Sequence, residues 1–147
     1  MLSKESLKRG NFAPNEFFVS EKAKELGIKN YPKQEQSVLP CLMVVADKIQ
    51  EIRNLLQHPI KINSAYRCLE VNRAIGSKDN SQHVQGSAID FVCPLFGSPL
   101  EIVKFLKENK IQVDQCLVES SWVHLSIKHY NNRNQFASLL NGKFTII

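Results

Sequence analysis

The chain has 147 residues, which is enough for one domain with a sizeable apolar core and too short for two domains of ordinary size. Its formal net charge of +5 favours contact with a polyanion such as nucleic acid, an anionic membrane or an acidic cell-wall polymer. The basic residues are scattered, without a dense cluster or interleaved aromatic residues, so a solvated surface is the simpler interpretation. We therefore expect no nucleic-acid partner.

No segment is suited to crossing a bilayer or to directing secretion. The longest apolar run, residues 38–46, is interrupted by Pro40 and is far shorter than the roughly 20 residues of a spanning helix. The positively charged N-terminus is not followed by the apolar stretch of a secretory signal. The four cysteines match neither a zinc ribbon nor a disulfide-rich scaffold, so we expect free, mostly buried thiols, with a disulfide as the alternative.

The first third of the chain predicts helices. Asn15 and Ser20 can cap two short helical pieces, and we interpret residues 1–35 as a helical segment that packs on the core. From Ser37 to Leu56, apolar residues recur at the spacing of one helix face, which predicts the longest helix. Pro40 is expected in its first turn, where a missing N–H is harmless.

A strand is predicted next, because residues 60–64 alternate between apolar and polar side chains. It leads to Tyr66 and Arg67 at its end, where side chains can project over a site. The guanidinium of Arg67 is permanently charged and forked, so it can clamp a carboxylate or polarise a carbonyl oxygen. A structural ion pair is the alternative role for this arginine. Residues 69–75 then predict a short helix that Gly76 ends.

Half of a metal site is indicated by His83 and Asp90, because imidazole and carboxylate are both good zinc ligands. Asp90 lies in a predicted buried strand and His83 on the preceding loop, with a turn at Gly86 bringing the two together. A hydrolytic zinc centre uses three protein ligands and an open water position. His124 lies in a second alternating apolar stretch and is the candidate for the third ligand.

Two strands are predicted around this histidine, over residues 111–119 and 122–127. If the two serines between them form a hairpin turn, Glu119 pairs with Trp122, and His124 lies two residues further along on the same face. Glu119 could then act as a general base toward the attacking water. Its separation from His124 favours this role over that of a metal ligand.

Two further elements complete the predicted fold. Ser98 and Pro99 can cap and begin a helix that runs to about Asn109. Asn141-Gly142 predicts a hairpin turn near the end of the chain. Together, the predicted elements indicate a single α+β domain over residues 1–147. We expect a small central antiparallel sheet with helices packed on one side, and a zinc site at a sheet edge or cleft.

In combination, the motifs resemble those of the zinc D-alanyl-D-alanine carboxypeptidase and L-alanyl-D-glutamate endopeptidase family of peptidoglycan peptidases, which includes phage endolysins. Residues 11–32 also resemble the N-terminal segment of the small bacterial and phage branch of this family. The resemblance rests on three motifs: Ser64-x-Tyr66-Arg67, Ser81-x-His83-x-x-Gly86-x-Ala88-x-Asp90, and Glu119 followed by Trp122-Val-His124.

This resemblance implies that His83, Asp90 and His124 hold one Zn²⁺ per chain. It also implies that the carboxylate near the last histidine is general base and then general acid, and that Arg67 orients the substrate or stabilises the oxyanion. The implied reaction is hydrolysis of an amide bond in the peptidoglycan stem peptide, of the D-Ala-D-Ala carboxypeptidase or the L-Ala-D-Glu endopeptidase type.

The same resemblance assigns supporting roles to three other side chains. Tyr66, Ser81 and Trp122 are expected to brace the site or to contact the stem peptide. Neither Ser81 nor Tyr66 is expected to be a nucleophile, because the two histidines that could activate it are committed to zinc.

The sequence departs from the family pattern at the base. Several relatives carry an acidic residue three positions before the final histidine, whereas this chain has Ser121 there. Glu119 is the nearest carboxylate, and Asp114 is the more distant alternative. This departure leaves open a catalytically inactive zinc-containing domain that binds the cell wall or takes part in phage morphogenesis, while the net charge leaves open a nucleic-acid-binding protein. We expect a monomer that acts on the cell wall or in the periplasm, where a phage or prophage lysis or virion protein would fit.

Overall fold

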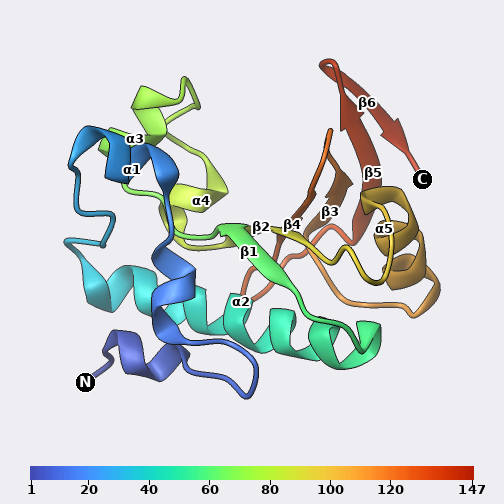
Figure 1. Cartoon of the computed structure of the whole chain (residues 1–147), viewed down its shortest axis with the longest axis horizontal. Helices are drawn as coiled ribbons and strands as arrows, with labels where there is room; N and C mark the ends of the chain where they lie inside the picture. Colours follow the sequence, from blue (N-terminus) through green and yellow to red (C-terminus); the bar gives the residue numbers. More distant parts are fainter.

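A six-stranded sheet forms the centre of the molecule, in the order β1-β2-β4-β3-β5-β6 (Figure 1). The computed structural model describes residues 1–147. The strands are β1 (Lys61–Ser64), β2 (Ala88–Val92), β3 (Gln115–Val118), β4 (Val123–Ser126), β5 (Gln135–Leu140) and β6 (Lys143–Ile146).

Neighbouring strands are antiparallel except for β3 and β5, which are parallel. β4 ends and β5 begins beside Gln115, the first residue of β3, and the two strands pair with opposite edges of β3. β5 therefore runs in the same direction as β3. The α+β class is thus confirmed, and the sheet is mixed where a purely antiparallel one was expected.

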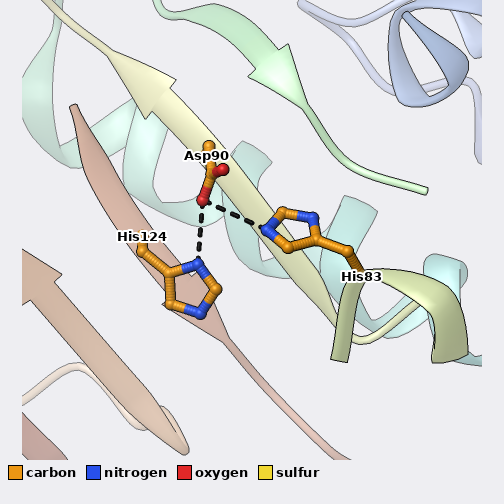
Figure 2. A group of neighbouring side chains, drawn as sticks. All are labelled: His83, Asp90 and His124. Atoms are coloured by element: carbon orange, nitrogen blue, oxygen red, sulfur yellow. Dashed lines mark hydrogen bonds and ion pairs between the residues drawn. The ribbon is translucent and has the colours of Figure 1, made fainter. Parts of the chain in front are cut away.

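Helical segments precede and interrupt the strands. They are the 3-10 helices η1 (Lys4–Leu7) and η2 (Pro14–Phe18) and the α-helices α1 (Glu21–Leu26), α2 (Glu35–Leu56), α3 (Leu69–Ala74), α4 (Gln82–Gln85) and α5 (Pro99–Glu108). The buried sides of α2 and α5 share one apolar core with the strand residues Ile89, Phe91, Val123 and Leu125. In the close view, α2 passes behind β2, on the side away from the side chains drawn there (Figure 2).

The N-terminal segment contributes to the same core through Leu7, Phe12 and Phe17. Its last helix, α1, begins and ends as predicted. The hydroxyl of Ser20 accepts a hydrogen bond from the backbone N–H of Ala23 at 3.0 Å, and Gly27 ends the helix with a φ of 68°.

Helix α2 is the longest element, as predicted, but it begins at Glu35. Pro40 therefore lies inside the helix and not in its first turn, which corrects the sequence-based expectation. Because proline has no backbone N–H, the carbonyl of Gln36 lacks the helical hydrogen bond that another residue at position 40 would donate. No helix in the structure combines the length and the apolar character needed to span a bilayer.

All four cysteines are free, as expected. Cys93 and Cys116 are buried, whereas Cys41 and Cys68 are half-buried. Burial raises the pKa of the Cys93 thiol and that of the Cys116 thiol, so both behave as apolar core side chains at neutral pH.

Candidate metal centre

Three side chains from three different elements, α4, β2 and β4, converge on one face of the sheet (Figure 2). The Nε2 atom of His83 lies 3.3 Å from Oδ1 of Asp90, and the Nδ1 atom of His124 lies 2.8 Å from the same oxygen. One donor atom from each residue lies within 4.8 Å of the other two. Ligands bound at roughly 2 Å from a single tetrahedral ion are separated by such distances, so the three donors could hold one metal ion.

The register of β2 and β4 places two of these donors together. Asp90 is directly opposite His124 in this antiparallel pair, and their neighbours Ile89 and Leu125 point into the core, where both are fully buried. A shift of one residue in the pairing would turn the apolar side chains toward the site and the donors toward the core. The apolar alternation of the two strands therefore also fixes the position of the polar pair.

The third donor, His83, lies in the short helix α4, which corrects the expectation of a loop. The Ser81 hydroxyl accepts a hydrogen bond from the backbone N–H of His83 at 3.2 Å, and Gly86 ends the helix with a φ of 80°. Gly86 lies against α2, since a Cβ atom built on it would come within 3.1 Å of the Val38 carbonyl oxygen. The close backbone approach expected at this glycine is thus present.

A hydrogen bond to the backbone selects the tautomer of His83. Its Nδ1 atom lies 2.7 Å from the carbonyl oxygen of Ala65, which can only accept, so Nδ1 carries the proton. The lone pair of Nε2 is then directed toward Asp90 and the site. Metal-binding histidines commonly donate their second ring N–H to a carbonyl in this way, which fixes the ring and raises its basicity.

The electrostatics of Asp90 also suit a cation. Burial alone raises the pKa of this carboxyl, but its hydrogen bond with His124 and the proximity of His83 outweigh burial and bring the pKa well below its usual range. Asp90 is therefore a carboxylate at neutral pH. Two imidazole nitrogens and one carboxylate oxygen form a donor set that fits zinc and leaves a fourth tetrahedral position open.

Arg67 lies beside this group, just after β1. Its backbone N–H donates to the carbonyl of His83 at 3.1 Å, which ties the end of the strand to α4. Its side chain forms none of the ion pairs in the structure, and its buried Nε atom has no hydrogen-bond partner. Burial lowers the pKa of Arg67, and the charge of nearby Asp90 partly offsets this effect. The side chain is thus a half-buried cation with an unused donor.

Glu119 and Trp122 lie at the turn between β3 and β4. The backbone N–H of Glu119 donates to the carbonyl of Trp122 at 3.0 Å, which confirms the two-residue turn between them. Strand alternation places both side chains on the same face as His124. Burial raises the pKa of the Glu119 carboxyl, His124 lowers it and the charge of Asp90 raises it, with a net increase.

Asp114, the alternative candidate for the base, is a buried carboxylate that takes part in a structural ion pair. Its side chain is 0% exposed, and Arg133 binds both carboxylate oxygens, with Nε 3.0 Å from Oδ1 and Nη2 2.8 Å from Oδ2. These bonds place the pKa of Asp114 well below its usual range despite burial. Gln82 donates to Oδ2 as well, at 2.9 Å. No local sequence pattern indicates these partners, because Gln82 and Arg133 approach Asp114 only when the sheet forms.

The remaining predicted side chains have different surroundings. Ser81 caps α4, and Trp122 is half-buried on the face that carries His124. Tyr66 is buried and lines a separate cleft of about 450 Å³ between α3 and the N-terminal segment, in which none of the three donors takes part. Burial raises the pKa of Tyr66 to about 12.

The fold and the site define a class of small α+β domain in which two histidines and one aspartate converge on a sheet face as potential metal ligands. A sequence profile of a family described as peptidase M15 matches residues 10–126, a range that includes all three donors, Arg67 and Glu119. The chain therefore belongs to the peptidase M15 family. A comparison with curated proteins found no match. Membership of this family confirms the expectation of a peptidase.

Proposed function

We propose that the protein is a zinc metallopeptidase that hydrolyses an amide bond in the stem peptide of peptidoglycan. The observation that carries this proposal is the convergence of His83, Asp90 and His124, with donor atoms within 4.8 Å of one another, in a chain of a peptidase family. A zinc ion bound by these residues would supply a water nucleophile near neutral pH and would polarise the scissile carbonyl.

In this mechanism Glu119 is the general base. It would take a proton from the attacking water and then deliver it to the leaving amine. Two observations support this role: strand pairing places Glu119 on the face of His124, and partial burial raises its pKa toward the range that suits proton transfer near neutral pH. Asp114 is not available for this role because Arg133 and Gln82 bind its oxygens.

Arg67 would bind and orient the substrate. Its guanidinium has an unpaired buried Nε donor, and its charge is not neutralised by an ion pair. Such a group can bind a substrate carboxylate or the oxyanion that develops on the scissile carbonyl. Stem peptides carry carboxylates, which a forked guanidinium suits better than a point charge does.

The other predicted residues would support the site. The half-buried ring of Trp122 would offer apolar surface to the substrate beside Glu119. Ser81 would hold the short helix that carries His83. Tyr66 would act on the substrate only through the cleft that it lines, since that cleft does not include the three donors.

We further propose that the protein acts as a monomer on the cell wall or in the periplasm. The bond cleaved would be D-Ala-D-Ala or L-Ala-D-Glu. A second candidate function is a catalytically inactive zinc domain that binds the cell wall or takes part in phage morphogenesis. The observation that favours it is Ser121, which occupies the position where several relatives have an acidic residue.

Digestion of purified muropeptides, combined with metal analysis, tests this proposal. We expect wild-type protein to hold one zinc ion per chain and to release a product whose mass identifies the cleaved bond. His83→Ala should lose both properties, whereas the matched variant His129→Ala, at an exposed histidine, should retain both. Cleavage that persists in His83→Ala would refute the mechanism. Zinc-loaded wild-type protein without cleavage would favour the inactive domain.

A further inference from the structure

Helix α4, which carries His83, has only four residues. A single helical turn is not stable in isolation, so other parts of the molecule must fix its position. The Ser81 cap, the bond from the Arg67 N–H to the His83 carbonyl and the bond from the His83 ring to Ala65 connect it to neighbouring loops and to the end of β1. None of these bonds reaches β4, the strand that carries His124.

One hydrogen bond joins α4 to that part of the sheet. The side-chain amide of Gln82 donates to Oδ2 of Asp114 at 2.9 Å. Asp114 precedes β3, and its backbone N–H donates to the carbonyl of Ser126 in β4 at 2.8 Å. The Ser126 hydroxyl also donates to Oδ2, at 3.4 Å. Ser126 lies two residues after His124, so a short hydrogen-bonded path connects the two histidine-bearing elements.

Asp114 is a rigid anchor for this path. Its two oxygens accept hydrogen bonds from the guanidinium of Arg133, and Oδ1 also accepts one from the Arg133 backbone N–H at 3.0 Å. The carboxylate is fully buried, and hydrogen bonds to an ionised acceptor are stronger than neutral ones. The orientation of Asp114 is therefore determined largely without Gln82, which gains a fixed and strong acceptor.

We propose that Gln82 and Asp114 form a brace that sets the distance between the imidazoles of His83 and His124. Gln82 and Asp114 are then positioning residues for the metal ion. This inference rests on the proposed function, because it assumes that zinc binds the three donors. Donors already held at ligand distances lose less conformational freedom when the ion binds, and residues outside the ligand shell affect affinity for this reason. Without the brace, α4 would move relative to β4 and the apparent zinc affinity would fall.

The test compares Gln82 with Gln85, a glutamine of the same helix that makes only a 3.4 Å contact with the Asn80 carbonyl. Gln82→Met preserves side-chain volume and removes the amide donor, Gln82→Ala also removes the volume, and Gln85→Met is the matched control. The zinc dissociation constant is measured by competition with a chromogenic chelator, and the Co²⁺-substituted protein is examined by absorption spectroscopy. Thermal melting of the metal-free forms verifies folding.

We expect both Gln82 variants to bind zinc about tenfold more weakly than wild type, at the lower end of the range for residues outside the ligand shell. Their Co²⁺ spectra should change, because the ligand geometry changes, whereas Gln85→Met should match wild type in both measurements. Gln82 variants with the wild-type dissociation constant and Co²⁺ spectrum would overturn the brace. A wild-type protein that binds no zinc would instead overturn the proposed function.

Discussion

Asp90 lies directly opposite His124 in the β2–β4 pair, and Oδ1 of the aspartate is 2.8 Å from Nδ1 of the histidine. Two of the three candidate ligands are thus held by a strand register that the core enforces. The third, His83, depends on a single helical turn and its hydrogen bonds. The site therefore combines a rigid pair with a donor whose position is set separately.

Glu119→Gln should retain zinc and lose hydrolysis. The substitution preserves size and removes the base, so we expect kcat to fall about 10²- to 10⁴-fold. Activity requires the ionised carboxylate, and the pKa of Glu119 is raised. The wild-type acid limb of kcat/KM should accordingly report deprotonation of Glu119, and it should be absent from the residual activity of the variant. Stopped-time assays across pH, with metal analysis of each sample, provide the measurement. A variant with wild-type kcat would exclude Glu119 as the base.

We expect Arg67→Lys to impair the activity as strongly as Arg67→Ala does. Lysine keeps the charge but lacks the planar fork and the Nε donor, which is buried and unpaired in this structure. We expect either variant to reduce kcat/KM by about 10²- to 10³-fold, as for loss of an oxyanion donor, with zinc content unchanged. Steady-state kinetics on a defined stem peptide measure this effect. Full activity in Arg67→Lys would mean that charge alone is sufficient.

Asp114→Ala should destabilise the fold by about 1–3 kcal/mol, because it removes a buried charged acceptor of several hydrogen bonds, while the half-exposed Arg133 can be rehydrated. Urea unfolding measures this change, and Asp79→Ala, which removes an exposed partner of Arg73, is the control. The folded-state pKa of Asp114 is depressed, so its contribution is fully present above about pH 4 and is lost as the pH falls toward the folded value. If the difference in unfolding free energy between wild type and Asp114→Ala stayed constant below about pH 4, this assignment would be contradicted.

Gly86→Ala should cost more stability than Gly76→Ala. Both glycines have a positive φ, of 80° and 78°, so alanine is strained at either position by about 1–2 kcal/mol. At Gly76 an added Cβ would contact nothing within 4 Å, whereas at Gly86 it would lie 3.0 Å from Val38 Cγ1. The difference between the two free energies of unfolding isolates the packing of α4 on α2. Equal costs would show that this close approach is unimportant.

Much of the site follows from local sequence patterns. Apolar, branched and aromatic residues identify β2, and alternating apolar residues identify β4. The turn before Trp122 sets the register that places Glu119 and His124 on one face. Residue chemistry then selects His83, Asp90 and His124 as candidate ligands. The predictions of the strands and of the turn are confirmed because strand patterns and a two-residue turn are short-range features.

Other features depend on contacts that no local pattern encodes. A four-residue helix is too short for its periodicity to be detected, so α4 resembles a loop in the sequence. The crossover that makes β3 and β5 parallel is a property of the assembled sheet. The bonds of Asp114 with Gln82 and Arg133 join residues brought together only by folding. The contacts that hold the candidate ligands in position therefore cannot be predicted from the sequence alone.

The most direct test is X-ray diffraction at the zinc absorption edge, on crystals of protein purified without chelator. We expect one anomalous peak per chain, within bonding distance of Nε2 of His83, Oδ1 of Asp90 and Nδ1 of His124. The same position should lack the peak in crystals of Asp90→Ala. A wild-type crystal without anomalous density between these three donors would contradict the central claim that they form a zinc site.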